Sequence, residues 1–181
     1  MSLKNTNESY GKLTVILHWL MAAMIIGLVA AGFLMDMMEK GDLRSFVVTS
    51  HKATGFVVIF LGLFRWYWMI TNQSPSPLAS LTKAEIGISH ATKWLLMLLL
   101  LVMPISGMLM SMFHGYGINF YGLFNIAPFV AENKDIGKVF GSIHEIGAYA
   151  ISIVIGLHVI AAIRHHFIKK DDTLNRILGR K

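Results

Sequence analysis

Residues 143–167 of the chain read IHEIGAYAISIVIGLHVIAAIRHHF. This stretch is predominantly apolar, and a helix of about 20 apolar residues is long enough to cross the hydrocarbon core of a bilayer. Three further stretches meet the same criterion, and they cover residues 13–35, 51–71 and 88–112. Because none of the four shows the two-residue alternation of a barrel strand, helices are the expected form. The sequence therefore predicts an all-α fold, an integral membrane four-helix bundle that forms a single domain over residues 1–181.

The composition of the chain agrees with a membrane protein and excludes several classes of function. Hydrophobic residues make up 55% of the 181 residues and charged residues only 14%, which is too apolar a balance for an ordinary soluble domain. The net charge of +6 comes from Lys and Arg residues that gather at the termini and in one connection, a distribution typical of membrane proteins rather than of nucleic-acid-binding proteins. Since the chain has no cysteine, disulfides, iron–sulfur clusters and thiolate catalysis are excluded.

The distribution of basic residues among the connections predicts the orientation of the bundle. Eleven of the 16 Lys and Arg residues lie in or at the edges of the N-terminal tail, the second connection and the C-terminal tail, and five lie around the first and third connections. By the positive-inside rule, both termini are then cytoplasmic. The third connection, residues 114–142, is the longest and is rich in glycine and aromatic residues, so we expect it to pack as a lid over the outer end of the bundle.

Four of the eight histidines pair by their depth in the predicted bundle. His18 and His158 lie toward the cytoplasmic ends of the first and fourth helices, whereas His51 and His144 open the second and fourth helices at the outer side. The 14 residues from His144 to His158 span about 21 Å of helix and leave both rings on roughly the same face. The fourth helix therefore offers a ligand at each of two depths, and the first and second helices each supply an opposing ring.

Paired imidazoles at two depths are the geometry that two six-coordinate haems require. Neutral imidazole is a good axial ligand of haem iron, and two such ligands leave no open position for oxygen, so we expect electron transfer rather than oxygenation. The nearby glycines Gly55, Gly147 and Gly156 would let a flat macrocycle approach the backbone, although small residues also serve ordinary helix contacts. On the residues alone, the alternatives are a site for zinc or another metal ion, and polar histidines that lie at the headgroup level.

Several segments, in order along nearly the whole chain, resemble the bacterial cytochrome b561 family. They are Leu17-His18-Trp19, Ser50-His51-Lys52-Ala53-Thr54-Gly55, Met103-Pro104-Ile105-Ser106-Gly107, Gly115-Tyr116 with Gly122-Leu123-Phe124, Ile143-His144-Glu145, and Gly156-Leu157-His158 with Arg164-His165-His166-Phe167 and Lys170-Asp171-Asp172. The resemblance implies a multi-pass dihaem protein of the bacterial inner membrane. It implies that His18 and His158 ligate the iron of an inner haem b, and that His51 and His144 ligate the iron of an outer haem b.

The resemblance also implies a reaction. Members of the family exchange electrons with the ubiquinone pool, and at least one branch acts as a superoxide oxidase that sends the electron from superoxide to quinone. This chain has Lys93 where the family often has a histidine one turn into the third helix.

Two further residues are weaker candidates for contacts with a cofactor. Arg65 lies near the inner end of the second helix, where its planar fork would match a haem propionate, although snorkelling to the headgroups is an equal alternative. His165 follows His158 by seven residues and returns to about the same helix face. It would meet a haem propionate or a quinone carbonyl there, and the alternative is a plain interfacial residue. The sequence assigns no catalytic residue.

Three functions are compatible with these predictions. The first is an oxidoreductase or electron-transfer cytochrome with an external donor such as superoxide, which Lys52, Arg44 and Lys138 would attract unless they are simply solvated. The second is a haem-bearing membrane anchor for a separate dehydrogenase, and the third is a small transporter whose histidines carry protons or metal. Membrane lipid and quinone are the expected partners, and nucleic acid is not.

Overall fold

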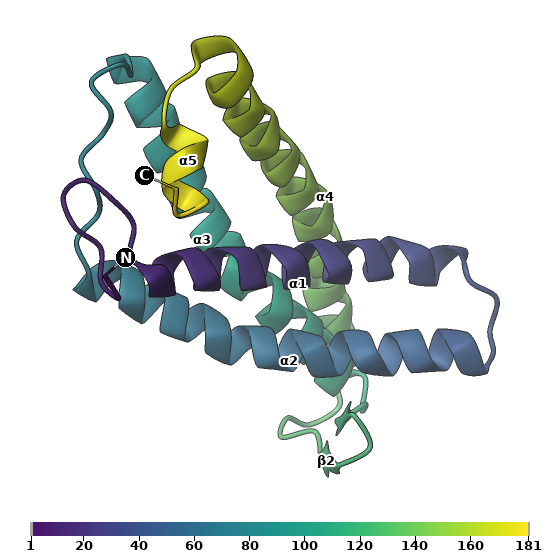
Figure 1. Cartoon of the computed structure of the whole chain (residues 1–181). Coiled ribbons are helices and arrows are strands. Elements are labelled where there is room, and N and C mark those ends of the chain that lie inside the picture. The colour runs from purple at the N-terminus through teal and green to yellow at the C-terminus, as the bar shows by residue number, and fades with distance from the viewer. Residues whose placement is uncertain (1, 181) are drawn as a thin grey trace.

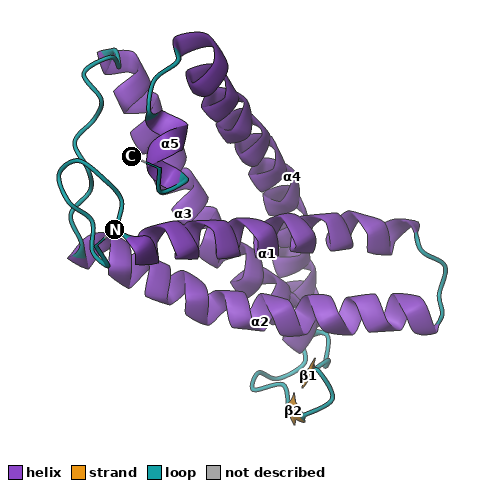
Figure 2. Ribbon diagram, viewed as in Figure 1, coloured by secondary structure: helices purple, strands orange, loops and turns teal. Residues whose placement is uncertain are grey.

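The computed structural model describes residues 2–180, and within them four long helices dominate the chain (Figures 1 and 2). These are α1 (Lys12–Met37), α2 (Asp42–Thr71), α3 (Lys83–Phe113) and α4 (Lys134–Arg164). Each is long and apolar enough to cross a membrane, so the predicted all-α, four-helix membrane fold is confirmed. The smaller elements are the strands β1 (Ile118–Phe120) and β2 (Phe124–Ile126), the π-helical turn η1 (His165–Lys169) and the short helix α5 (Thr173–Ile177).

Two helices begin nine residues earlier than the hydropathy of the sequence predicted. α2 starts at Asp42 rather than at residue 51, and α4 starts at Lys134 rather than at residue 143. The reason is that an apolar stretch marks only the part of a helix that lies in hydrocarbon, whereas a polar first turn can extend beyond it. Asn133 caps α4 in this way, because its side chain accepts hydrogen bonds from the backbone N–H groups of Asp135 and Ile136.

These longer helices correct two expectations. His51 and His144 do not open their helices but lie nine and ten residues inside them. The third connection is shorter than predicted, since it spans residues 114–133 and folds into the antiparallel hairpin β1–β2. At its other end α4 stops at Arg164, and the turn η1 continues the chain to Lys169.

The long helices form two hairpins that cross each other (Figure 1). α1 packs against α2, α3 packs against both α2 and α4, and the buried core draws on all four helices. Met21, Val58, Leu100 and Ile151 each belong to this core. Many other apolar side chains on the helices are exposed, as expected where a helix faces lipid instead of water. The assignment of the whole chain to one domain, including Met1 and Lys181 outside the described residues, stays a prediction.

Three segments that are far apart in the sequence meet at the end of the bundle where the termini lie. The Asn5 side chain donates to the carbonyl of Gln73, and the Gln73 side chain donates back to the carbonyl of Asn5. From the C-terminal segment, Arg176 Nη1 donates to the carbonyl of Ser76 over 2.7 Å. The N-terminal tail, the connection from α2 to α3 and the C-terminal segment therefore share one side of the bundle, and its cytoplasmic location stays a prediction.

Candidate functional site

The four histidines selected from the sequence form two facing pairs. The ring centroids of His18 on α1 and His158 on α4 are 6.3 Å apart, and those of His51 on α2 and His144 on α4 are 6.2 Å apart. An imidazole nitrogen lies about 1 Å from its ring centroid and about 2 Å from a bound metal ion, so two rings on opposite sides of one ion have centroids about 6 Å apart. Both pairs therefore have the spacing of two imidazoles that share a metal ion.

The number of ligands at each pair limits the kind of metal centre. Zinc takes four protein ligands in structural sites and three in catalytic sites. Within residues 2–180, no group of three or more His, Asp or Glu side chains is placed to hold a metal ion. A pair of imidazoles suits an iron whose other four ligands come from a macrocycle, as in a haem with two axial histidines.

Hydrogen bonds orient the ring of His144. Its Nδ1 lies 2.9 Å from the carbonyl oxygen of Met103 and 3.3 Å from Oγ of Ser106, both on α3. Because a carbonyl only accepts, Nδ1 carries the proton and donates it, which leaves the lone pair on Nε2. Metal-bound histidines are commonly held in this way by a backbone carbonyl. Nδ1 of His51, across the pair, is buried and has no hydrogen-bond partner among the described residues.

A cavity of about 490 Å³ lies at the His51–His144 pair and is lined by residues of all four long helices. Its volume falls within the usual range of small-molecule and cofactor sites. Its walls are mostly apolar, with Gly55 beside His51, and four charged residues also line it, namely Asp36, Arg44, Lys52 and Glu145. A Cβ built on Gly55 would meet no heavy atom within 4 Å, so this part of the wall is open. A flat macrocycle between the two rings fits these residues.

The His18–His158 pair has more open surroundings. His158 is exposed, and a Cβ built on Gly156 would meet nothing within 4 Å. Arg65 on α2 lies near enough to His18 for their charges to interact. No hydrogen bond or ion pair within residues 2–180 engages its guanidinium. These features fit a second macrocycle with a propionate near Arg65, and that role of Arg65 stays a prediction.

One of the three glycines expected to admit the macrocycle has a different role. Gly147 is buried, and a Cβ built on it would clash with the sulfur of Met103 on α3. The missing side chain therefore allows α3 and α4 to pack closely, which was the alternative interpretation of small residues in these helices.

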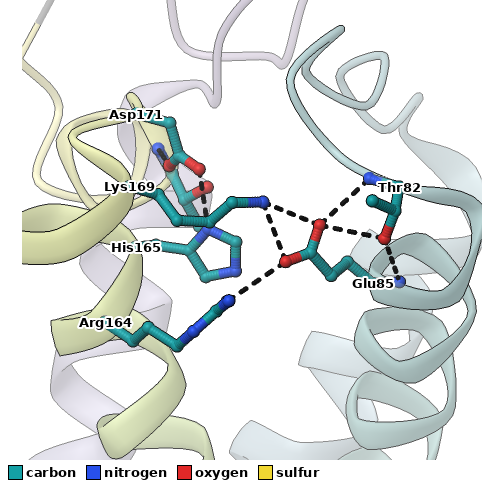
Figure 3. A network of polar contacts seen from close by, with 7 residues as sticks. Thr82, Glu85, Arg164, His165, Lys169 and Asp171 are labelled. Carbon is teal, nitrogen blue, oxygen red and sulfur yellow. Dashed lines mark hydrogen bonds and ion pairs between the residues drawn. The ribbon is translucent and has the colours of Figure 1, made fainter.

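His165 takes part in a polar network at the C-terminal end of α4 (Figure 3). Its Nδ1 donates to Oδ2 of Asp171 over 2.7 Å, and both side chains are largely buried. Burial alone would raise the pKa of the Asp171 carboxyl, but the hydrogen bonds from Thr173 and His165 outweigh it and lower the pKa. Nε2 of His165 has no hydrogen-bond partner within residues 2–180, so the predicted contact with a quinone or a propionate stays a prediction.

The same network contains a carboxylate that the sequence analysis did not select. Glu85 accepts hydrogen bonds from Lys169 Nζ over 2.7 Å and from Arg164 Nη1 over 3.1 Å, which ties the start of α3 to the end of α4 (Figure 3). It also forms a capping box with Thr82. The signal for the cap was present in the sequence as Thr82 followed by Glu85 three residues later, but the ion pairs depend on the tertiary fold.

The three basic residues considered for anion attraction have different surroundings. Lys52 is not simply solvated, because its Nζ donates to Oγ of Ser111 over 2.7 Å and lies over the Tyr116 ring. Arg44 donates through Nε to the carbonyl of Met35 and lines the cavity. Lys138 lies away from the cavity lining and forms an exposed ion pair with Asp135. Two of the three thus remain candidates for this role.

Comparisons with known proteins point in the same direction as the geometry. Residues 9–180 match the family model described as prokaryotic cytochrome b561. The chain is 32% identical over 181 residues to cytochrome b561 homolog 2 of Escherichia coli (strain K12), an alignment that covers 99% of this chain and 96% of that protein. It is 26% identical to the probable superoxide oxidase CybB of Yersinia pestis, with 97% of this chain and 98% of that protein covered. It is also 27% identical to cytochrome b561 homolog 1 of Escherichia coli (strain K12), with 95% and 98% covered.

Proposed function

Since the chain belongs to the prokaryotic cytochrome b561 family, we propose that it is a dihaem cytochrome that transfers electrons between an external donor and the ubiquinone pool. Membership of the family implies binding of b-type haem, and the four spanning helices make the chain a multi-pass protein of the bacterial inner membrane. The number of haems, the donor and ubiquinone as the acceptor are parts of the proposal.

The observation that carries the proposal is the equal spacing of the two histidine pairs. His18 and His158 bind the inner haem b, and His51 and His144 bind the outer one. Centroid separations of 6.3 Å and 6.2 Å support these assignments, as does α4, which contributes one ring to each pair. When bound, haem supplies a one-electron redox couple, and two imidazole ligands keep oxygen from binding to its iron.

The protein's own residues orient the ligands and exclude water. The carbonyl of Met103 holds the Nδ1–H of His144, which keeps Nε2 available as the ligand atom. Apolar side chains from all four long helices form most of the lining of the outer site and make it unfavourable for water. Arg65 offers its guanidinium to a propionate at the inner site, where its fork matches a carboxylate.

Superoxide is the external donor that we propose. One relative with 26% identity carries the name probable superoxide oxidase. Arg44 and Lys52 line the cavity of the outer pair and would attract an anion, although Asp36 and Glu145 also line it and offset their charge. In the balanced reaction, two superoxide anions become two molecules of O2. Their two electrons, together with two protons, reduce one ubiquinone to ubiquinol. His165 is the candidate for contact with the quinone carbonyl or with a propionate at the inner side.

The test is the haem content of the purified protein. We expect a pyridine haemochrome assay to find two haem b per chain, and His51→Ala and His158→Ala each to remove or alter one of them. His90→Ala is the matched control, because His90 is a membrane-span histidine outside both pairs and its loss should leave both haems intact.

Kinetic measurements then test the donor and the acceptor. Stopped-flow mixing with superoxide should reduce the haem, and added ubiquinone should reoxidise it; both steps are followed by the haem absorption spectrum. A folded protein that contains no haem after expression with adequate haem supply would contradict the proposal and favour the transporter. Copurification of a soluble redox subunit, with no reaction toward superoxide, would favour the membrane anchor.

A further inference from the structure

The connection between α3 and α4 contains a long segment without charge. Residues 115–131, which we call the aromatic loop, include no Asp, Glu, Lys or Arg. Charged residues resume immediately afterwards, with Glu132, Lys134 and Asp135. Several large apolar side chains of the loop are exposed, among them Leu123 at 77% and Phe129 at 64%. An uncharged, apolar loop of this length is unusual where a protein faces only water.

The aromatic loop is fixed to the outer part of α2. Ile118 is buried, the ring of Phe120 packs against that of Phe56, and the Tyr121 hydroxyl shares a hydrogen bond of 2.7 Å with Oγ1 of Thr54. Figures 1 and 2 show the hairpin at the end of α3 and α4, beside α2. One face of the loop therefore packs on the bundle, which leaves its other apolar side chains directed outward.

The level of this contact on α2 places the loop at a membrane boundary. Thr54 and Phe56 lie at the start of residues 53–64, the longest part of α2 without a charged residue, and this part is the portion of α2 best suited to hydrocarbon. Exposed apolar side chains of α2 such as Phe60 and Leu63 continue along the same stretch. The exposed side of the aromatic loop is thus continuous with a helix surface that faces lipid.

We propose that the aromatic loop lies in the headgroup region of the bilayer, on the side opposite the termini, with Leu123, Phe124 and Phe129 inserted toward the acyl chains. Tyrosine and other amphipathic aromatic residues are favoured at this level of a membrane, and Tyr116 and Tyr121 in the loop are also exposed. A soluble electron donor that docks by charge complementarity would need charged residues, and the loop has none. The occupant of this surface is therefore lipid.

The absence of cysteine from the chain makes the test direct. We would introduce Leu123→Cys or Phe129→Cys into the full haem-containing protein, attach a fluorescent thiol probe, and reconstitute it into phosphatidylethanolamine–phosphatidylglycerol vesicles. Asp135→Cys, at an exposed charged position, is the control for water, and Leu63→Cys on α2 is the control for lipid. Haem absorbance equal to that of the parent protein shows that each variant is folded.

We expect probes at Leu123→Cys and Phe129→Cys to be quenched by lipids brominated near the headgroup. The probe at Leu63→Cys, which lies about 14 Å further along α2 than Thr54, should be quenched instead by lipids brominated deep in the acyl chains. Quenching by aqueous iodide should be severalfold weaker than at Asp135→Cys. Iodide quenching as strong as at Asp135→Cys would overturn the proposal, because the loop would then lie in water. Protection from both quenchers would also overturn it and would indicate a second copy or another protein on this surface.

Discussion

Gly107 and His144 are in direct contact, so this single glycine controls the position of a proposed ligand. A Cβ built on Gly107 would lie 2.8 Å from Cε1 and 3.0 Å from Nδ1 of the His144 ring. Side chains essentially never approach so closely, and α3 is held by its packing against α2 and α4. The ring of His144 is therefore the group that must move when a side chain is added.

We predict that Gly107→Ala alters or removes the outer haem and leaves the inner one. Overpacking of this kind typically costs about 1–3 kcal/mol, and here the strain acts on the ligand ring. The measurement is the haem-to-protein ratio together with the low-temperature absorption spectrum. Gly87→Ala is the matched control, because Gly87 lies on the same helix outside the cavity lining and a Cβ built on it would meet nothing within 4 Å. If Gly107→Ala retained both haems with unchanged spectra, the proposed role of His144 would be wrong.

The pairing of the histidines is the part of the candidate site that the sequence predicted. Hydropathy and loop charge gave each helix a direction, and direction was enough to place His18 beside His158 and His51 beside His144. The environment of each ring was not predictable, since the Met103 carbonyl and Ser106 reach His144 from a helix that has no ligand of its own. Hydrogen bonds between helices depend on how each helix is rotated about its axis and on its depth in the membrane. Hydropathy does not determine either quantity to within one residue.

At the scale of elements, the least predictable part is the join between α4 and α5. Phe167 and Ile168 resume the apolar pattern after Arg164 and two histidines, so the sequence predicted one helix to residue 167. The structure instead changes to the π-helical turn η1 and then to Lys170 in the left-handed conformation, with φ of 52°. At this join Glu85 binds Arg164 and Lys169, and Asp171 binds His165. Hydropathy does not predict these contacts, because it carries no information on which polar side chains meet in the folded chain.

We predict that Glu85→Gln loosens the C-terminal segment without changing haem content. The substitution removes the negative charge that faces Arg164 and Lys169 while keeping the size of the side chain. Hydrogen–deuterium exchange should become faster in residues 165–178, and high salt should produce part of the same effect in the parent protein. Lys138→Gln, which breaks only the exposed pair with Asp135, is the control and should leave this exchange unchanged.

Acid should open the same segment through Asp171. Burial raises the pKa of this carboxyl in the folded protein, but hydrogen bonds from Thr173 and His165 outweigh burial, so that the folded pKa is lower than that of a free aspartate. Its stabilising contribution is therefore complete above the ordinary pKa of an aspartate and is lost as the pH falls through the lowered value. Limited proteolysis at decreasing pH should show the segment opening on that acidic side. In Asp171→Asn the cleavage rate should be higher at neutral pH and should depend less on pH; an unchanged profile would contradict this account.

At the scale of the whole molecule, each of the two crossed helical hairpins supplies two of the four histidine rings, and α4 supplies one ring to each site. One helix with a ring at each depth fixes the distance between the two sites, because a helix is stiff along its axis. α1 and α2 each supply one partner ring, and their connection is short, with α1 ending at Met37 and α2 beginning at Asp42. The two sites therefore form together when the two hairpins pack.

The orientation of the molecule determines which site meets the external donor, and one set of contacts shows which segments share a side. Asn5, Gln73, Ser76 and Arg176 join the N-terminal tail, the connection from α2 to α3 and the C-terminal segment, so these segments share one side of the membrane. We predict that this side is cytoplasmic, because it carries most of the basic residues. In right-side-out spheroplasts, an impermeant maleimide should label Asp135→Cys and fail to label Asn175→Cys until the membrane is broken. The opposite labelling would place the His51–His144 pair on the cytoplasmic side, and an external donor would then have to reduce the haem between His18 and His158.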